Sequence, residues 1–366
     1  MKVSHCLLIK SLSEPSSILS LSLKDWDLLI RQARSARLLA SLYFLCVDEN
    51  ILEGIPQRAL NHLDSASKQA EKTVISAMWE LSLISKIANR LECPVIILKG
   101  AAYAKLSYSN SRGRIFSDVD LLVPEEQIYD AEVAFVKAGW ESSKTDEYDQ
   151  QYYRKWMHEL PPMRNTRTGV SLDLHHSILP KTASIKVEAK KLIANAKLLD
   201  GEENLYVFSK EDMLLHSIVH LFNEGEFEHG LRDLVDQDYM LRTFSLNDAK
   251  FYDELADRAN ALGLGLPLFY AVRYCQIMLN RTFPKSFIGA ISQFAPRNIW
   301  FMDKLFLRAL MPDHKSCDDW FTSAARWLLF VRSHYLRMPP HLLIPHLLRK
   351  AYKSRMKDKE VKAEAV

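Results

Sequence analysis

The sequence predicts an α+β fold in which a small mixed-sheet core lies between two helical regions. Apolar residues recur at helical spacing from about residue 15 to 90 and again from about residue 186 onward. Between these regions, short apolar runs rich in β-branched residues end at Gly, Pro or polar residues, as buried strands do. We therefore expect an N-terminal helical region at residues 1–92, an α/β core at 93–182 and a C-terminal helical region at 183–366.

The composition is that of an ordinary globular chain. It has 366 residues, of which 48% are hydrophobic and 25% charged, so it can bury a sizeable core without disulfides or metals. The net charge of +3 argues mildly against a large RNA footprint. The five cysteines are widely spaced without a C-x-x-C motif, so we expect reduced thiols in a cytoplasmic protein. We see no secretory signal, and no run approaches the ~18 apolar residues of a membrane span.

The N-terminal region contains two helical patterns. One runs from Leu28 to Leu42 and the other from Leu63 to Leu91. Pro56 and Pro94 mark element boundaries.

The sequence of the first half of the core, residues 95–123, predicts two strands. Val95–Leu98 is an apolar run that ends at Lys99-Gly100, and a helix follows at Ala101–Ser107. After a polar loop at 108–114, Ile115–Val123 predicts a second strand, which Pro124 stops.

The second half of the core begins with an amphipathic helix at Glu125–Ala138, which ends at Gly139. A strand pair is expected across 151–160 and 170–179, with the turn at 165–169. The rest of the chain predicts helices at 211–222, 231–243, 249–261, 266–280 and 318–337, with fraying at Lys350 to Lys362.

Asp118 and Asp120 lie inside an apolar strand. Residues i and i+2 of a strand point to the same face, so both carboxylates project together. Two neighbouring anions favour a cation between them, and oxygen ligands suit a hard ion such as Mg²⁺. An isolated Asp-x-Asp pair is usually an exposed strand face without function. Here the apolar flanks and a third aspartate, Asp173 in the run Val170–Leu174, favour a metal site.

Gly100 ends the first strand at the point where a helix begins. A helix N-terminus offers free N–H groups to phosphate, and Gly allows close approach to the backbone. One Gly is a weak signal, but its place before an Asp-x-Asp strand gives it weight.

Several short motifs together resemble one family. They are Leu98-Lys99-Gly100-Ala101, Arg114-(x)3-Asp118-Val119-Asp120, Ala138-Gly139-Trp140 and Asp173-Leu174-His175. This set resembles the uncharacterised nucleotidyltransferase family of the DNA polymerase β-like superfamily. The later segments 215–220 and 231–234 agree with it, so the resemblance covers roughly residues 25–245.

The resemblance implies a nucleotidyltransferase core that moves an NMP unit from an NTP, such as ATP, to an acceptor hydroxyl. Asp118 and Asp120 would hold two Mg²⁺ ions, and Asp173 would complete the metal site and take the hydroxyl proton. Gly100 and Ala101 would cradle the phosphates. The superfamily's usual Gly-Ser or Gly-Gly turn is replaced here by Lys99-Gly100-Ala101, which lacks a hydroxyl, so Lys99 would supply charge instead.

Other polar residues have two interpretations. Arg114 is the better of Arg112 and Arg114 as a triphosphate clamp, although both also fit a solvated loop. His175 shares a strand face with Asp173 and would either join the metal site or, as we favour, make a structural hydrogen bond.

The pair His216 and His220 has the i, i+4 spacing of some zinc sites but lacks the Glu of the metalloprotease motif. A helix that faces the core, with one His in the substrate cleft, is the favoured interpretation. The aromatic stretch at 148–156 could stack a base but more often packs within a strand; it contains Tyr148, Tyr152, Tyr153 and Trp156, with Arg154 and Lys155.

Three functional hypotheses follow. The first is a Mg²⁺-dependent nucleotidyltransferase whose acceptor is a small molecule, a protein side chain or an RNA 3′ end; superfamily relatives include antibiotic-modifying enzymes and toxins. The second is a non-catalytic nucleotide-binding or scaffold protein, against which the three carboxylates argue. The third is a helical metal-binding protein centred on His216 and His220.

Overall fold

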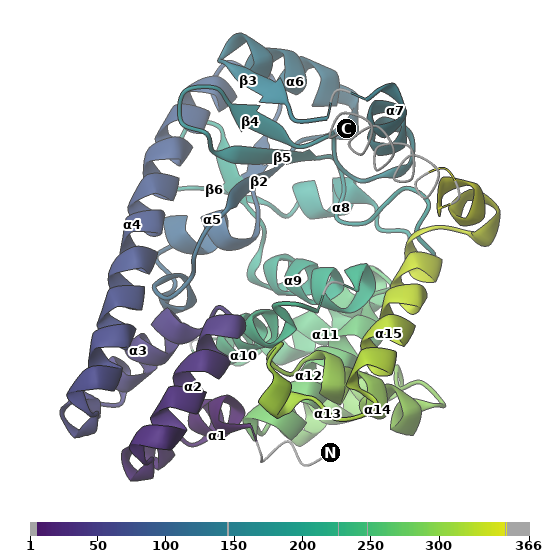
Figure 1. Ribbon diagram of the computed structural model, residues 1–366. Coiled ribbons are helices and arrows are strands. Elements are labelled where there is room, and N and C mark those ends of the chain that lie inside the picture. Colours follow the sequence, from purple (N-terminus) through teal and green to yellow (C-terminus); the bar gives the residue numbers. More distant parts are fainter. Residues whose placement is uncertain (1–5, 145, 226, 247, 348, 350–366) are drawn as a thin grey trace, which may run out of the picture.

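The structure is a computed structural model that describes residues 6–144, 146–225, 227–246, 248–347 and 349. It is 63% helical with a seven-stranded mixed sheet flanked by helices. The predicted α+β class is therefore confirmed (Figure 1).

The N-terminal part consists of α1 (Leu7–Ser13), α2 (Leu23–Ser35), α3 (Leu39–Asp48) and α4 (Gln57–Ala88). Ser22 and Asp25 form a capping box at the start of α2, in which each side chain accepts a hydrogen bond from the other's backbone N–H. The 32-residue α4 runs from the other N-terminal helices up to the sheet (Figure 1). Short 3-10 turns occur at Pro15–Ser20, Leu52–Gly54, Ser109–Ser111, Glu125–Gln127 and Lys315–Cys317.

The sheet has the order β3-β4-β5-β2-β1-β7-β6. The strands are β1 (Val95–Ile97), β2 (Asp118–Leu122), β3 (Trp140–Ser142), β4 (Met163–Asn165), β5 (Ser171–His175), β6 (Lys197–Leu198) and β7 (Leu205–Val207). At its centre β2 is antiparallel to β1 and parallel to β5, and β1 is parallel to β7. The short helix α5 (Lys99–Lys105) follows β1, and α6 (Ile128–Lys137) contacts β3 and β5.

The prediction of a strand at 151–160 is wrong. Most of this stretch belongs to the helix α7 (Glu147–Trp156), and the strand that pairs antiparallel with β5 is β4, next to the expected turn. Asp146 caps α7 by accepting the N–H groups of Tyr148 and Asp149. Acidic residues in its first turn and basic residues in its last turn also suit the helix dipole. These signals outweigh the strand preference of the aromatic residues.

The expectation of helices alone after about residue 186 is also wrong. β6 and β7 extend the sheet from this part of the chain, and β7 pairs directly with β1. Strands of two or three residues are too short to show a period in the sequence. The boundaries at residues 92 and 182 stay a prediction.

The helices expected in the C-terminal part are present. They are α9 (Lys210–Glu224), α10 (Gly230–Leu246), α11 (Phe251–Ala261), α12 (Gly265–Leu279) and α15 (Thr322–Arg337), together with the additional α8 (Ala189–Ile193), α13 (Lys285–Ser292) and α14 (Ile299–Ala309). None of the helices in the described ranges combines the length and apolar character needed to cross a membrane.

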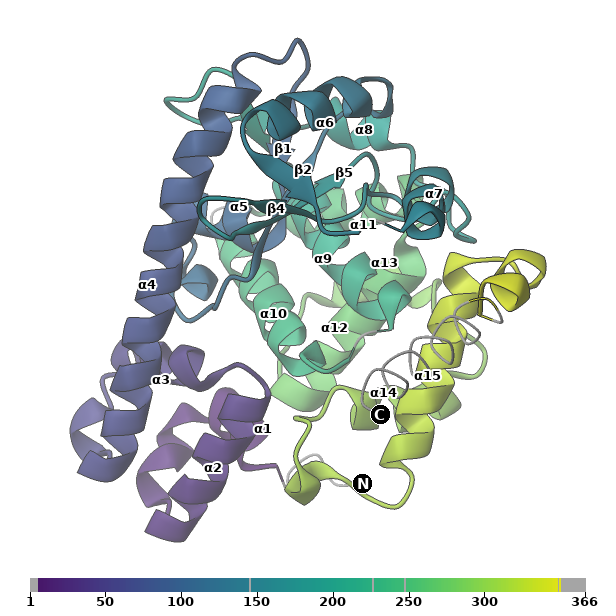
Figure 2. The ribbon, with the colours of Figure 1, turned by 45° about the horizontal axis from the view of Figure 1, so that its top comes forward.

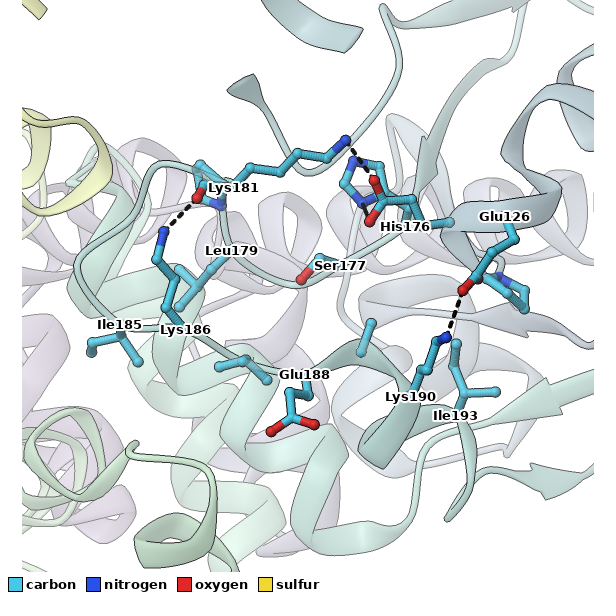
Figure 3. Close-up of a pocket in the computed structure, with 15 residues that line it drawn as sticks. Glu126, His176, Ser177, Leu179, Lys181, Ile185, Lys186, Glu188, Lys190 and Ile193 are labelled. Atoms are coloured by element: carbon cyan, nitrogen blue, oxygen red, sulfur yellow. Dashed lines mark hydrogen bonds and ion pairs between the residues drawn. The ribbon is translucent and has the colours of Figure 1, made fainter. Parts of the chain in front are cut away.

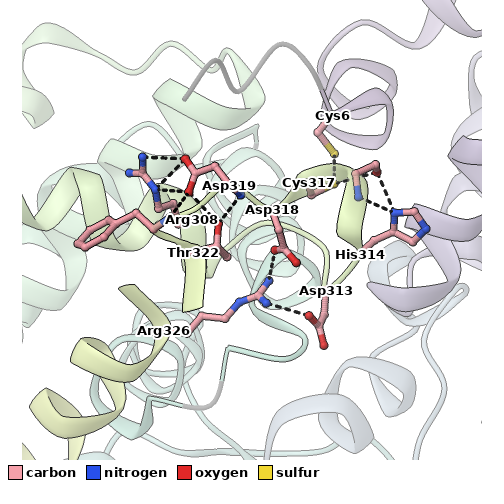
Figure 4. Close-up of polar contacts among 11 residues, drawn as sticks. Cys6, Arg308, Asp313, His314, Cys317, Asp318, Asp319, Thr322 and Arg326 are labelled. Carbon is pink, nitrogen blue, oxygen red and sulfur yellow. Dashed lines mark hydrogen bonds and ion pairs between the residues drawn. The ribbon is translucent and has the colours of Figure 1, made fainter. Parts of the chain in front are cut away.

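The segment before α15 is fixed by ion pairs and by contact with the N-terminal part. Arg308 donates to Asp319 at 3.0 Å, and Arg326 donates to Asp313 at 2.8 Å (Figure 4). The Sγ atoms of Cys317 and Cys6 lie 3.6 Å apart, and all five cysteines are buried, free thiols. These contacts orient α15, which approaches α7 at its C-terminal end (Figure 2).

Candidate active site

One face of the sheet gathers the three predicted carboxylates. Asp118 and Asp120 are i, i+2 residues of β2, so their side chains share a face. In the parallel pairing of β2 with β5, Asp120 is the register partner of Asp173 and Asp118 that of Ser171. The structure therefore brings Asp118, Asp120 and Asp173 together.

These carboxylates line a cavity of about 590 Å³. This size is within the ~300–1,000 Å³ of small-molecule sites. Its walls come from β2 and β5, from α7, from His220 on α9, and from α15 with the residues after it. The lining residues from the C-terminal part are Phe330, His334, Arg337, Met338, Leu343, His346 and Leu347.

Asp120 is buried among positive and hydrogen-bonding groups. His175 Nε2 donates to Asp120 Oδ1 at 3.1 Å, and Lys99 Nζ lies 3.7 Å from the same oxygen. Burial raises the pKa of Asp120, but the Lys99 ammonium and the His175 hydrogen bond together hold that pKa well below its usual range. The Asp120 carboxylate is therefore ionised at neutral pH.

Asp173 is less well compensated, since among the described residues only the Lys99 ammonium lowers its pKa. Its Oδ1 is buried without a hydrogen-bond partner in the described part of the chain. Burial, followed by the charges of Asp120 and Asp118, raises the pKa of Asp173 to about 7. A buried acceptor without a donor, beside two further carboxylates, fits a hard divalent cation, because oxygen ligands are what Mg²⁺ prefers.

Of the residues predicted to hold phosphate after β1, Lys99 faces the cavity. It has a left-handed backbone with φ of +46°, and its ammonium reaches Asp120. Gly100 and Ala101 are buried and are not among the cavity's lining residues. A Cβ on Gly100 would lie 2.8 Å from both Arg114 Nε and Phe116 Cε1, so close packing already explains why glycine is present.

Arg114 lies apart from the cavity lining. Its guanidinium is buried in an ion pair with Asp236 of α10 and lies over the Tyr103 ring, 5.7 Å from the centroid. This pair joins the loop before β2 to α10. Nothing local in the sequence marks Asp236 as the partner of a residue 122 positions away, so this pair was not predictable from it.

The two histidines of α9, His216 and His220, lie in different surroundings. His220 lines the cavity, whereas His216 is buried; burial, then the nearby Lys99 and His175, lower the pKa of His216 well below its usual value. Among the described residues, the pair belongs to no three-member cluster of metal-ligating side chains.

The aromatic residues of α7 form one wall of the cavity. Tyr152 and Tyr153 line it, and the Tyr152 ring stacks on His346 with centroids 4.2 Å apart. Burial, then the Glu159 and Asp173 carboxylates, raise the pKa of Tyr153 to about 12, so its hydroxyl stays protonated. The C-terminal wall was not predictable from the sequence, because residues more than 150 positions from Asp173 carry no local sign of contact with it.

Figure 3 shows a second, smaller hollow, of about 300 Å³. Pro180 lines both this hollow and the cavity. The basic residues of the hollow are largely neutralised: Lys181 pairs with Glu125 at 2.7 Å and Lys190 with Glu126 at 2.6 Å. The larger cavity, with its converging carboxylates, is the candidate active site.

A comparison with family models matches residues 22–280 to a family described as uncharacterised nucleotidyltransferase. The match spans more than two thirds of the chain, from α2 to the end of α12. The chain belongs to the uncharacterised nucleotidyltransferase family. The family expected from the motifs is thus confirmed, and membership supports a general nucleotidyl-transfer function with an NTP as substrate.

Searches among the curated proteins and among the solved structures found no match to this chain. The wall of the cavity formed by α15 and residues 338–347 lies beyond the matched segment.

Proposed function

We propose that this chain transfers an NMP unit from an NTP to an acceptor hydroxyl, with Mg²⁺ held by Asp118, Asp120 and Asp173. The observation that carries the proposal is the convergence of these three carboxylates on one sheet face, at a cavity of about 590 Å³. Family membership supports nucleotidyl transfer, and the donor set supports the metal.

Bound Mg²⁺ would lower the pKa of the attacking hydroxyl and neutralise charge on the phosphates. Asp118 and Asp120, fixed by β2, would hold it. Asp173 would complete the metal site and take the hydroxyl proton. In the reaction, the acceptor oxygen bonds to the α-phosphorus, the bond to the β-phosphate oxygen breaks, and pyrophosphate leaves.

The cavity also offers groups for the rest of the NTP. Lys99 and Arg337 are the Lys and Arg residues among the described lining, at positions from which they would meet phosphate oxygens. Tyr152 and Tyr153 present aromatic surface at which a base would stack. Arg114, which is committed to Asp236, is not part of this proposal.

The test is an incubation of the purified chain with Mg²⁺, cell extract and each of the four NTPs, labelled at either the α- or the γ-phosphate. We expect the α-label alone to enter an acceptor, and its sensitivity to nuclease or protease identifies an RNA or protein acceptor. Transfer of the γ-label would indicate phosphoryl transfer instead. No transfer of either label, together with no Mg²⁺-dependent NTP binding, would reject the enzyme and favour the non-catalytic alternative.

A further inference from the structure

We propose that His158, Glu159 and His175 form a second metal site, beside the three aspartates, which takes a divalent transition-metal ion such as Zn²⁺. The proposal does not depend on nucleotidyl transfer. It rests on how the backbone brings the three side chains together, on the distances between their ligand atoms and on their chemical type.

The backbone holds these residues side by side. Residues 158–160 follow α7 and run antiparallel to the end of β5, where Glu159 and His175 form a β-bridge. Leu160 N–H donates to Leu174 O at 2.9 Å, and His176 N–H donates to His158 O at 2.9 Å. Residues opposite each other in an antiparallel bridge present their side chains to the same face, so Glu159 joins His175 on the cavity side.

The ligand atoms have separations suited to one ion. One donor atom from each of the three residues lies within 4.8 Å of the others. His175 Nε2 lies 3.5 Å from Glu159 Oε2 and 3.1 Å from Asp120 Oδ1. In a tetrahedral site with bonds of about 2.0–2.1 Å, ligand atoms are about 3.3–3.4 Å apart. Small side-chain shifts would therefore place His158, Glu159 and His175 around one ion, with a fourth position left for water or substrate.

The donor types separate this site from the carboxylate site. Two imidazoles with carboxylates are a usual zinc ligand set, whereas Mg²⁺ favours oxygen ligands alone. His158 and His175 are 6% and 1% exposed, which limits competition from water. His158 and Glu159 also line the cavity, so an ion has a path of entry.

Coordination replaces an existing contact without leaving a charge unpaired. An ion at this position uses the Nε2 lone pair of His175, so the ring proton moves to Nδ1 and the hydrogen bond from Nε2 to Asp120 is lost. Asp120 keeps the Lys99 ammonium, which lies 3.7 Å from its Oδ1.

The experiment uses the full chain, stripped of metal with a chelator and titrated with Co²⁺ as a spectroscopic probe of the zinc site. We expect one Co²⁺ with visible absorption typical of tetrahedral coordination, displaced by Zn²⁺ but not by Mg²⁺. His158→Gln should weaken Co²⁺ binding by at least about tenfold, since even loss of a residue that orients a ligand costs about 10–100-fold. Asp118→Asn is the matched control, because it removes a carboxylate of the neighbouring site and should leave the Co²⁺ spectrum intact.

The proposal is overturned if Co²⁺ gives no such absorption, or if binding survives His158→Gln and is lost in Asp118→Asn. Glu159→Gln provides a second test should His158→Gln fail to fold, which circular dichroism would show. Because the readout is absorption rather than label transfer, failure here leaves the nucleotidyltransferase proposal standing, and the reverse is also true.

Discussion

Asp120 and Asp173 are register partners on two parallel strands, yet their carboxyl groups differ in protonation. Asp120 accepts a hydrogen bond from His175 and lies near Lys99, and its pKa is held low. Asp173 has an unpartnered Oδ1 in the described part of the chain, and burial and the neighbouring aspartates raise its pKa to about 7. Lys99 and His175 therefore balance the charge of Asp120, whereas the Lys99 ammonium offsets only part of the rise in the pKa of Asp173.

The raised pKa of Asp173 predicts how pH and Mg²⁺ act on stability. The ordinary pKa is 3.8, so between about pH 4 and 7 the folded carboxyl keeps a proton that the unfolded one has lost. This contribution to stability is fully present below pH 4 and is lost as pH rises through about 7. Thermal melting should therefore show that Mg²⁺ stabilises the chain more at about pH 8 than at about pH 5, since metal and proton compete.

The matched variant is Asp173→Asn, which cannot ionise. It should melt at nearly the same temperature with and without Mg²⁺ and lose part of the decline with rising pH. An equal Mg²⁺ effect in the variant and the native chain would show that Asp173 is not a ligand.

Gly225 lies against α15, so we expect a substitution at Gly225 to change both stability and NTP binding. It ends α9 with φ of +77°, and a Cβ there would approach Ser333 of α15 more closely than side chains allow. Gly225→Ala should therefore lower the free energy of unfolding by about 2–4 kcal/mol, from backbone strain plus overpacking. It should also displace α15 and weaken NTP binding.

Gly201 is the matched control, with φ of +76° and no atom within 4 Å of a built Cβ. In urea unfolding, Gly201→Ala should lower the free energy of unfolding only by the backbone strain of a left-handed residue, about 1–2 kcal/mol. If both variants lost the same unfolding free energy, a Cβ at position 225 would not clash with α15.

We expect the largely buried ion pair of Arg114 and Asp236 to stabilise the fold and not to bind the NTP. Removing one partner leaves a buried charge, so Arg114→Met or Asp236→Asn should each cost about 3–5 kcal/mol in unfolding free energy. The double variant should cost less than the sum. If the Arg114→Met variant instead kept full stability but bound NTP weakly, this result would support the triphosphate clamp expected from the sequence.

Lys99 and Gly100 should respond differently, although they are adjacent. Lys99 lines the cavity, so Lys99→Met should weaken NTP binding and reduce its salt dependence. It should also lower stability, because the buried Asp120 then loses the ammonium beside it and keeps its hydrogen bond to His175. A Cβ on Gly100 meets Arg114 and Phe116, so Gly100→Ala should cost about 1–3 kcal/mol of stability. Isothermal titration and thermal melting separate the two effects; a stable Gly100→Ala with lost NTP affinity would instead support a phosphate cradle at Gly100.

The sequence predicted the elements whose signals are local. The apolar run at 95–98 and the Asp-x-Asp strand each became strands of the sheet, and α4 and α9–α12 follow the helical period. Strand alternation alone was enough to place Asp118 and Asp120 on one face. The strand expected at 151–160 is instead largely the end of α7 (Glu147–Trp156), because Asp146 caps a helix there.

The rest of the site depends on contacts between distant parts of the chain. His346 reaches Tyr148 and Tyr152 across almost 200 residues, and Arg337 and His334 approach the aspartates from α15. Glu159 meets His175 only because residues 158–160 run beside β5, which follows from the position of α7. Such pairings are set by tertiary packing and leave no periodic trace in the sequence.

The most direct test of the central claim compares transfer of α-labelled NMP by the native chain with transfer by Asp118→Asn and Asp120→Asn, in the presence of Mg²⁺. Glu188→Gln, a carboxylate change in the neighbouring hollow, is the control. The account predicts Mg²⁺-dependent transfer by the native chain and the control, and transfer reduced to background in both aspartate variants. Undiminished transfer by the aspartate variants would contradict it.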